Sequence, residues 1–266
     1  MAYGRFLLHL YSYSPSTQTT YKNTIKWFVD SAPKYIDQIR GEHIEQFLSA
    51  AKKTHAATTV NIYLAAIRNF FDWLEANYDV INRARRVKRL KILPPHRRNL
   101  TVEEYSRVIK VTTGYERDLI QLTAMVGVRA SEILSIRQEN IKGDFLAFLG
   151  KGSKQCSCPL NSIAKNILKD PNFINFLKNK NRVWFFRLCH RASKLAGLEK
   201  PFSPHKLRHF YANILHRSQN GKPGLPIETI SKLMNHSTPS VTASVYIEWL
   251  NEELIGKTEK LAKLSI

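Results

Sequence analysis

Apolar residues recur at every third or fourth position through residues 14–80, which places them on one face of an α-helix. The longest stripe predicts a helix that ends near Asn77, and its members are Val60, Leu64, Ile67, Phe71 and Leu74. Two shorter stripes predict earlier helices, one from Ser16 to a stop at 30–33 and one around Ile44. Polar and basic residues fill the opposite faces, so the stripes form the expected core of an all-helical N-terminal domain.

The period changes to two between Asn140 and Leu160, which is typical of β-strands. Gly143 marks one turn and the glycine-rich segment 150–154 a second, so we expect a small antiparallel sheet with Lys151 at a hairpin tip. Helical spacing flanks this sheet; the expected helices lie within 101–127, just after Arg129, over 163–168 and 183–195, and from Pro204 onward. The chain is therefore predicted to be mainly α with a small antiparallel β-sheet.

Local signals mark several of these boundaries. Thr101 and Glu104 have the spacing of a capping box, and Gly127 suits a helix C-terminus. Glu132 follows Arg129 by three positions, so its carboxylate is expected to hold the arginine side chain in place.

Residues 83–98 have neither period and are dense in Arg and Lys. Pro94 and Pro95 cannot continue a helix and favour extended backbone. We therefore expect a helical domain over 1–82, a basic linker over 83–98, and a second domain with a C-terminal tail over 99–266. The linker's charges would repel one another if left free, and a phosphate backbone would accommodate them.

The net charge of the chain narrows the class of its binding partner. Lys and Arg total 41 against 21 Asp and Glu, a net charge of +20, which favours a polyanion. A basic membrane-surface protein is the competing interpretation, but we find no apolar run of about 18 residues, lipidation motif or signal peptide. The odd number of cysteines favours reduced thiols, with Cys156 and Cys158 on one face of a strand.

The helix expected from Pro204 carries a candidate anion site. His205 and Arg208 are three residues apart and share a face, with His209 one position further round. Ser203 is the candidate cap. Exposed N–H groups and the helix dipole both favour an anion there. His205 and His209 also have metal-ligand spacing, but the Glu of a His-Glu-x-x-His pattern is missing, so no metal is expected.

Four motifs in this order resemble those of the tyrosine recombinases, the phage integrase family, most closely the Xer-like or small integrase type. The motifs are Gly127–Leu134, Gly150–Lys154, His205–Arg208, and Leu233–His236 with Tyr246. Residues 14–80 are similar to the family's N-terminal core-binding domain. The resemblance implies an all-α, SAM-like N-terminal domain followed by an α+β catalytic domain.

The resemblance also implies two phosphate-binding arginines and a nucleophile. Arginine suits the first task because its charge is permanent and its planar fork matches phosphate, and Arg129 and Arg208 are the candidates. Tyr246 is the implied nucleophile. A phenol has a pKa of about 10, so it needs nearby positive charge and a proton acceptor such as His205.

Lys151 would protonate the departing 5′-oxygen, and His236 would donate to the phosphate or position it. The family's covalent 3′-phosphotyrosine keeps the bond energy, so strands rejoin without ATP, metal or another cofactor. The sequence agrees in having no P-loop and no Asp/Glu cluster of two-metal type.

Further basic residues are candidates for contacts to DNA phosphates. They are Lys22, Lys26, Arg68, Arg85, Arg86, Lys88, Arg89, Lys91, Arg97, Arg98 and Lys154. The resemblance implies double-stranded DNA as partner and a tetramer on paired sites, formed by a protein that is a monomer or dimer without DNA. It places the protein in the cytoplasm, at the nucleoid. The tail would dock on a neighbouring protomer, with local fraying or docking in cis as the alternatives.

Three features depart from the family pattern. Asn235 replaces the usual Gly, and Asn tolerates left-handed backbone. The His236–Tyr246 spacing is one residue longer, and 219–226 resembles a short insertion. Each site residue taken singly also has a purely structural interpretation. A site-specific recombinase is therefore predicted, with two alternatives: a type IB topoisomerase-like relaxase, or a non-catalytic DNA-binding protein on a degenerate recombinase scaffold.

Overall fold

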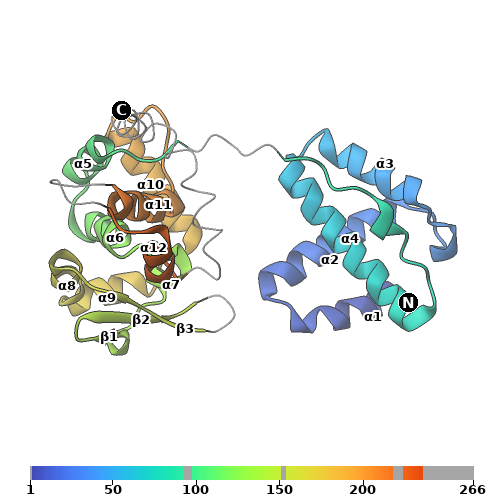
Figure 1. Cartoon of the computed structure of the whole chain (residues 1–266), viewed down its shortest axis with the longest axis horizontal. Coiled ribbons are helices and arrows are strands. Elements are labelled where there is room, and N and C mark those ends of the chain that lie inside the picture. The colour runs from blue at the N-terminus through green and yellow to red at the C-terminus, as the bar shows by residue number, and fades with distance from the viewer. Residues whose placement is uncertain (1, 93–97, 151–153, 218–223, 236–266) are drawn as a thin grey trace, which may run out of the picture. The chain divides into compact units, whose positions relative to one another are not determined.

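The structure of the protein, a computed structural model, describes residues 2–92, 98–150, 154–217 and 224–235. The chain divides into two compact units, Met1–His96 and Arg97–Ile266 (Figure 1). Each unit has its own buried apolar cluster, and each is described by itself below.

The N-terminal unit is helical. Its helices are α1 (Ala2–His9), α2 (Pro15–Ser31), α3 (Gly41–Lys52) and α4 (Ala57–Tyr78), with short 3₁₀ turns at Leu10–Ser12, Ile36–Gln38 and Arg83–Arg86. The central element is α4, which packs against α1, α2, α3 and the last 3₁₀ turn. All five members of its predicted stripe are buried, as the spacing required. Helices α2, α3 and α4 are therefore confirmed.

Helix α1 was not predicted from the sequence. Phe6 is fully buried, and its ring lies 4.9 Å from that of Phe70 and 5.6 Å from that of Trp73, both on α4. Edge-on aromatic packing of this kind stabilises a short helix that has little helical stability alone. The element depends on a tertiary partner, which is why its short apolar patch did not reveal it.

The first part of the expected linker also differs from the expectation. Residues 82–91, here called the strap, fold back along α4, and Ala84 and Val87 are buried in the N-terminal core. The cations of this segment alternate with small apolar residues that reach this core. The stretch that can connect the two units without such anchoring is therefore shorter than 83–98.

The second unit combines helices with one small sheet. Its elements are α5 (Val102–Val111), α6 (Gly114–Val126), α7 (Ala130–Leu134), a 3₁₀ turn (Gln138–Asn140), β1 (Ile141–Lys142), β2 (Phe145–Leu149), β3 (Gln155–Pro159), α8 (Ser162–Leu168), α9 (Pro171–Leu177), α10 (Arg182–Leu195), α11 (Pro204–His216) and α12 (Ile227–Leu233). The strands are antiparallel in the order β1-β2-β3, and the sheet occupies one edge of the unit (Figure 1). The predicted antiparallel sheet is confirmed.

Several predicted boundaries hold. The Thr101 hydroxyl accepts from the Glu104 N–H at 3.1 Å, and the Glu104 carboxylate accepts from the Thr101 N–H at 3.1 Å, which is the expected capping box. Helix α11 begins at Pro204, although the Ser203 hydroxyl makes no capping bond. The region 101–127 holds two helices, α5 and α6, and α9 was not predicted. Cys156 and Cys158 share one face of β3, as expected, and Cys158 is fully buried.

The core of the second unit is built around α6 and α11, which pack on each other. Its largest buried side chain is Arg208 of α11, only 1% exposed. Burying a charged group is costly unless it is well partnered, so this arginine marks the place where the fold serves something besides stability. None of the described helices is long and apolar enough to cross a membrane.

Candidate active site and DNA interface

Three of the predicted catalytic residues meet at one cavity. Arg129, His205 and Arg208 line a space of about 320 Å³, together with Arg182 and three small neighbours, Ala130, Ser131 and Pro204. This cavity is called the arginine pocket below. Its residues come from the starts of α7, α10 and α11. Motifs almost 80 residues apart in sequence thus supply one positively charged recess.

Arg208 is fixed by main-chain carbonyl groups. Its Nη1 donates to the Gly127 oxygen at 2.6 Å, and its Nη2 donates to the Met234 oxygen at 2.5 Å. These bonds tie α11 to the ends of α6 and α12. Carbonyl oxygens carry no net charge, so both bonds orient the guanidinium while leaving its positive charge in place.

Gly127 makes one of these anchors available. Its φ of 64° lies in the left-handed region, where glycine carries no steric penalty. A Cβ atom added at this position would lie 2.2 Å from Cδ1 of Tyr211, a side chain that is itself only 9% exposed. The helix C-terminus predicted at Gly127 is therefore confirmed, and the structure adds a second reason for glycine there.

Arg129 is held by a buried carboxylate, as predicted. Its Nη1 lies 2.8 Å from Oε1 of Glu132, and its own N–H donates to Oε2 of the same residue at 2.7 Å. Glu132 is 5% exposed, so a single carboxylate both caps α7 and orients the guanidinium. Arg129 retains about a third of its side-chain exposure and reaches the pocket from this anchor.

The electrostatic influence of Glu132 and Arg208 extends to Cys158. Burial, together with the charge of Glu132, raises the pKa of the Cys158 thiol to about 12, although the charge of Arg208 opposes the shift. The thiol is therefore protonated at neutral pH. It packs in the core of the second unit and does not serve as a nucleophile.

His205 is the exposed histidine of the pocket. Its ring lies 4.4 Å from that of His209 at 78°, an edge-to-face contact along α11, and His209 is buried. The i, i+4 spacing noted in the sequence thus produces a packed ring pair, with His205 facing the cavity. This placement suits His205 for proton transfer at a bound phosphate.

Arg182 is the pocket residue that the sequence analysis missed. It occupies the first turn of α10, whose N-terminus is capped by the Asn181 side chain at 2.9 Å from the Trp184 N–H. A cation in the first turn of a helix is unfavourable because it opposes the helix dipole. The presence of Arg182 there is the signal in the sequence that could have marked it as a functional residue. A larger cavity of about 880 Å³ shares Arg182 and His205 with the pocket and extends toward Phe186.

Three predicted catalytic residues, Lys151, His236 and Tyr246, lie outside the described residues, as does Arg97. The hairpin that leads to Lys151 is described on both sides, and the Gly150 N–H donates to the Lys154 oxygen at 2.8 Å. Lys154 itself is exposed beside this closing bond.

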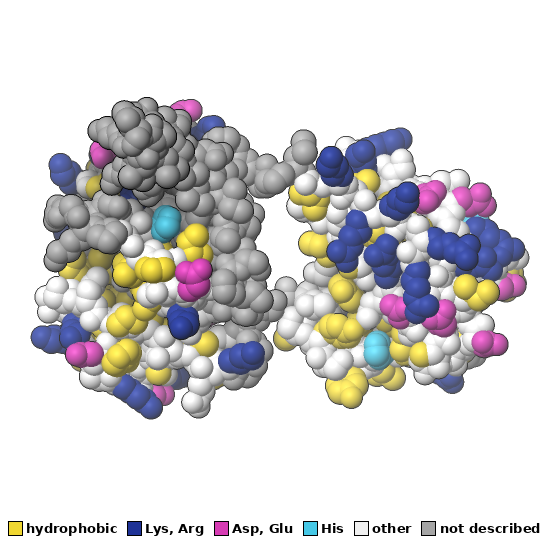
Figure 2. Space-filling model, viewed as in Figure 1, with side chains coloured by type: hydrophobic (Ala, Val, Ile, Leu, Met, Phe, Trp, Pro, Cys, Tyr) yellow, Lys and Arg dark blue, Asp and Glu magenta, His cyan; other side chains and the backbone are white. Residues whose placement is uncertain are grey.

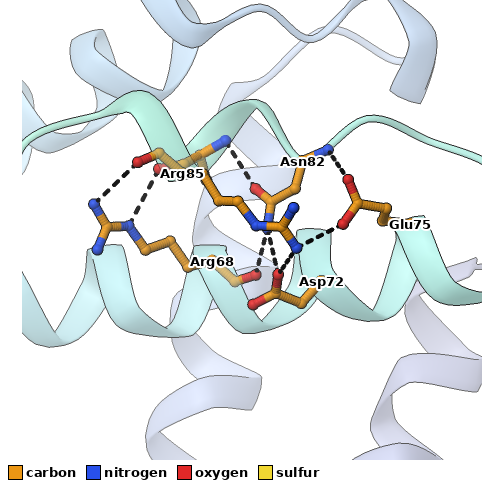
Figure 3. Close-up of polar contacts among 6 residues, drawn as sticks. Arg68, Asp72, Glu75, Asn82 and Arg85 are labelled. Atoms are coloured by element: carbon orange, nitrogen blue, oxygen red, sulfur yellow. Dashed lines mark hydrogen bonds and ion pairs between the residues drawn. The ribbon is translucent and has the colours of Figure 1, made fainter.

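The basic residues predicted to contact DNA in and beside the strap fall into two groups: arginines that attach the strap to α4, and cations exposed to solvent. Arg85 is ion-paired with Asp72 at 2.7 Å and with Glu75 at 2.6 Å, as Figure 3 shows. Arg68 donates from Nε to the Ala84 oxygen at 3.2 Å and from Nη2 to the Val87 oxygen at 2.6 Å. Both arginines thus hold the strap on α4.

Two asparagines complete this attachment. The Asn82 amide donates to the Asp72 carboxylate at 2.8 Å (Figure 3). Further along, Asn61 donates to the Leu90 oxygen at 2.9 Å and accepts from the Leu90 N–H at 2.8 Å. The strap is therefore secured at both ends.

The remaining cations of the strap point to solvent. The exposed ones are Arg86, Lys88, Arg89 and Lys91. Arg86 and Lys88 line a groove of about 410 Å³ with Lys52 of α3. Figure 2 shows Lys and Arg side chains gathered on this face of the N-terminal unit. A preformed row of cations along a groove is suited to a phosphate backbone.

The other candidates are dispersed. Lys22 and Lys26 are exposed on α2, one turn apart. Arg98 forms an ion pair with the buried Glu104 at 2.6 Å. Lys206 of α11 donates to the main-chain carbonyl oxygen of Arg98. Burial lowers the pKa of Lys206, and the nearby charge of Arg98 lowers it further. Arg98 therefore helps to fix the beginning of the second unit.

Comparison with known families now adds an independent observation. The phage integrase family model matches residues 98–253, and the model of the phage integrase N-terminal SAM-like domain matches residues 5–78. The chain belongs to the phage integrase family. The family prediction made from the motifs is thereby confirmed.

Relatives agree. A tyrosine recombinase of Thermosipho africanus is 29% identical over 97% of this chain and 98% of its own length. The tyrosine recombinase XerC of Caldanaerobacter subterraneus is 31% identical over 67% of this chain and 56% of its own length. The prediction of an enzyme of the tyrosine recombinase class is confirmed.

Solved structures share the fold. A lambda integrase dimer bound to a COC′ core site superposes with a TM-score of 0.77 at 16% identity, over 92% of this chain and 75% of that one. The XerH site-specific recombinase bound to a palindromic difH substrate gives 0.70 at 16% identity, over 91% and 79%. The predicted fold class, an all-α N-terminal domain plus an α+β domain of recombinase type, is confirmed.

Proposed function

We propose that this protein is a site-specific DNA recombinase that cuts and rejoins strands through a covalent 3′-phosphotyrosine, without metal or ATP. The observation that carries the proposal is the meeting of Arg129, Arg208 and His205 at one cavity. A phosphodiester in transit needs its non-bridging oxygens neutralised, and guanidinium groups fixed beforehand do so without reorganisation cost.

The charge balance of the pocket supports this role. Arg129 shares the Glu132 carboxylate with a backbone N–H, while Arg208 is oriented by two carbonyl oxygens. Arg182 adds a third guanidinium at the rim. Three arginines and one buried carboxylate leave the recess electropositive. This charge attracts a phosphate and lowers the pKa of a phenol that enters the recess.

The residues outside the described part take the roles that their motifs imply. Tyr246 attacks the phosphorus, His205 accepts the phenolic proton, Lys151 protonates the departing 5′-oxygen and His236 donates to the phosphate. Of the departures from the family pattern, Asn235 is accommodated, because its φ is 51°, in the left-handed region where the family has glycine. This removes one of the grounds for a degenerate, non-catalytic scaffold.

Double-stranded DNA is the proposed partner, gripped by both units, with the exposed strap cations on the phosphate backbone. Strand exchange would use a tetramer on paired sites, and a lambda integrase tetramer bound to a Holliday junction has the same fold, with a TM-score of 0.72. A substrate of this kind places the protein in the cytoplasm, at the nucleoid.

The test begins with a site selected from a random duplex library by the Tyr246→Phe variant, which binds without reacting. That site is then made with a nick next to the scissile phosphate, so that the covalent adduct cannot religate. Unsubstituted protein should form an adduct that survives denaturation, and Tyr246→Phe should form none. An adduct with both proteins, or with neither, would reject the mechanism. On intact paired sites, recombinant junctions support a recombinase, whereas relaxed supercoils alone would indicate a topoisomerase-like relaxase.

A further inference from the structure

The amide of Asn235 spans from the end of α12 to the sheet. Its Nδ2 donates to the Ser157 oxygen of β3 at 3.2 Å, across 78 residues of sequence. A carbonyl group can only accept, so the amide nitrogen must face it. Glycine, the usual residue at this position in the family, has no side chain with which to make this contact.

The strand register explains why this acceptor is available. In an antiparallel pair, residues that exchange main-chain hydrogen bonds alternate with residues that do not. Main-chain bonds join Gly150 to Lys154 and Asp144 to Leu160, at the two ends of the β2–β3 pair. Counting inward in steps of two places Ser157 at a non-bonded position, so its carbonyl group points away from β2. In the described sheet β3 is an edge strand, and Asn235 covers part of that edge.

The neighbouring residue connects this contact to the arginine pocket. Met234 is 3% exposed, and its carbonyl oxygen accepts from Arg208 Nη2 at 2.5 Å. The peptide group between Met234 and Asn235 is thus held on one side by the buried guanidinium and on the other by the sheet edge. The contacts form one chain, from Gly127 through Arg208 and Met234–Asn235 to Ser157.

We propose that Asn235 is a positioning residue for Arg208: its amide fastens the end of α12 to β3, and so fixes the carbonyl group that orients the guanidinium toward the phosphate. The left-handed backbone and the amide are separate contributions. The first permits the turn after α12, and the second locks it to the sheet. This inference rests on the proposed function, because it assigns Asn235 a part in the same phosphate site.

Three substitutions separate the two contributions. Asn235→Gly keeps the left-handed backbone and removes the donor. Asn235→Asp tolerates the same backbone and turns a carboxylate oxygen toward a carbonyl oxygen. Asn235→Ala removes the donor and strains the backbone. Asp79→Gly is the matched control: Asp79 has a φ of 54°, and it ends α4 in the N-terminal unit.

The measurement is single-turnover cleavage of the nicked duplex at saturating protein, with the DNA Kd measured separately. A lost hydrogen bond of ordinary strength should slow Asn235→Gly and Asn235→Asp by about three- to tenfold. The Kd should stay within about twofold, because base and backbone contacts are untouched. Asn235→Ala should be slower still and melt at a lower temperature, while Asp79→Gly should cleave at the unsubstituted rate.

A second substrate tests whether the effect passes through Arg208. In this duplex a methyl group replaces one non-bridging oxygen of the scissile phosphate, which removes the negative charge that Arg208 is proposed to meet. The deficit of Asn235→Gly should largely disappear on it. An unchanged rate for Asn235→Gly on ordinary DNA, or an equal deficit on both substrates, would overturn the positioning role while adduct formation by the unsubstituted protein still supports the recombinase. No adduct from the unsubstituted protein would overturn both.

Discussion

Two arginines, Arg85 in the strap and Arg208 in the pocket, show that the exposure of a side chain says little about its role. Arg85 has a side chain 58% exposed, yet two carboxylates neutralise it and it holds the strap to α4. Arg208 is 1% exposed, yet carbonyl oxygens orient it and it lines a cavity. The charge of the partner is what differs. Arg85 lies between two carboxylates and has little charge left for DNA, whereas the two carbonyl groups that orient Arg208 leave its charge in place. Arg129 lies between these cases, because one carboxylate holds it while about a third of its side chain stays exposed.

The most direct way to break this comparison is to substitute these two arginines in turn. Arg208→Ala should slow adduct formation by about 100-fold or more, since a preorganised donor to the phosphate is lost. Arg208→Lys keeps a charge but offers one nitrogen in place of the two that reach Gly127 and Met234, so it should also be slower by at least about tenfold.

Arg85→Ala is the control, with a lower thermal midpoint but a cleavage rate within about twofold of the unsubstituted protein. Circular dichroism and the DNA Kd establish that the Arg208 variants fold and bind. Slow cleavage by Arg85→Ala with normal cleavage by Arg208→Lys would reverse the roles assigned to the two regions.

The second prediction concerns the anchor of Arg208 at the end of α6. Gly127→Ala combines left-handed strain of about 1 kcal/mol with overlap against the Tyr211 ring, which costs about 1–3 kcal/mol in a packed core. Gly197→Ala is the matched control: its φ is 62° and its surroundings are open, so only the strain applies. Urea unfolding of both variants separates the two costs. Equal losses would show that the Tyr211 ring moves aside without penalty.

How much of this site the sequence could predict depends on how local each contact is. The Arg129–Glu132 pair and the capping box at Thr101 lie within one helical turn, so spacing was enough. The pocket position of Arg182 depends on how α10 and α11 pack, and no periodicity encodes that. The same reason hid the burial of Val87 in the strap, because its partner surface is formed by residues far back in the chain.

The third prediction sharpens the contrast within the strap itself. Arg86→Ala and Lys88→Ala should each reduce the slope of log binding constant against log salt concentration by about 1, since each removes an exposed phosphate contact. Arg85→Ala should change the slope by clearly less, because Asp72 and Glu75 already neutralise that charge. Filter binding across a salt series measures all three. If Arg85→Ala also reduced this slope by about 1, Arg85 would be shown to contact a DNA phosphate.

The smallest expected effect is a pH dependence of the free energy of unfolding, caused by two buried tyrosines of the second unit. Burial raises the pKa of Tyr211, beside Gly127, and that of Tyr105, which stacks on Phe210, each to about 12. In the unfolded chain a phenol titrates near 10. The unfolded state therefore releases these protons first, so the free energy of unfolding is unaffected below about pH 10 and falls as the pH rises toward 12.

Tyr211→Phe should flatten this decline in urea titrations between pH 8 and 11, whereas Tyr11→Phe, at a site 82% exposed, should not. A decline that is the same in all three proteins would show that the surroundings of Tyr211 are wetter than the packing indicates.

The central claim is that one phosphate meets both Arg129 and Arg208, and a crystal structure of the adduct trapped on the nicked duplex tests it most directly. The account predicts a phosphorus atom joined to the oxygen of Tyr246, with non-bridging oxygens within hydrogen-bond distance of Arg129 and Arg208 of one subunit. A phosphate that contacts only one of these arginines, or that is attached to another tyrosine such as Tyr211, would contradict it.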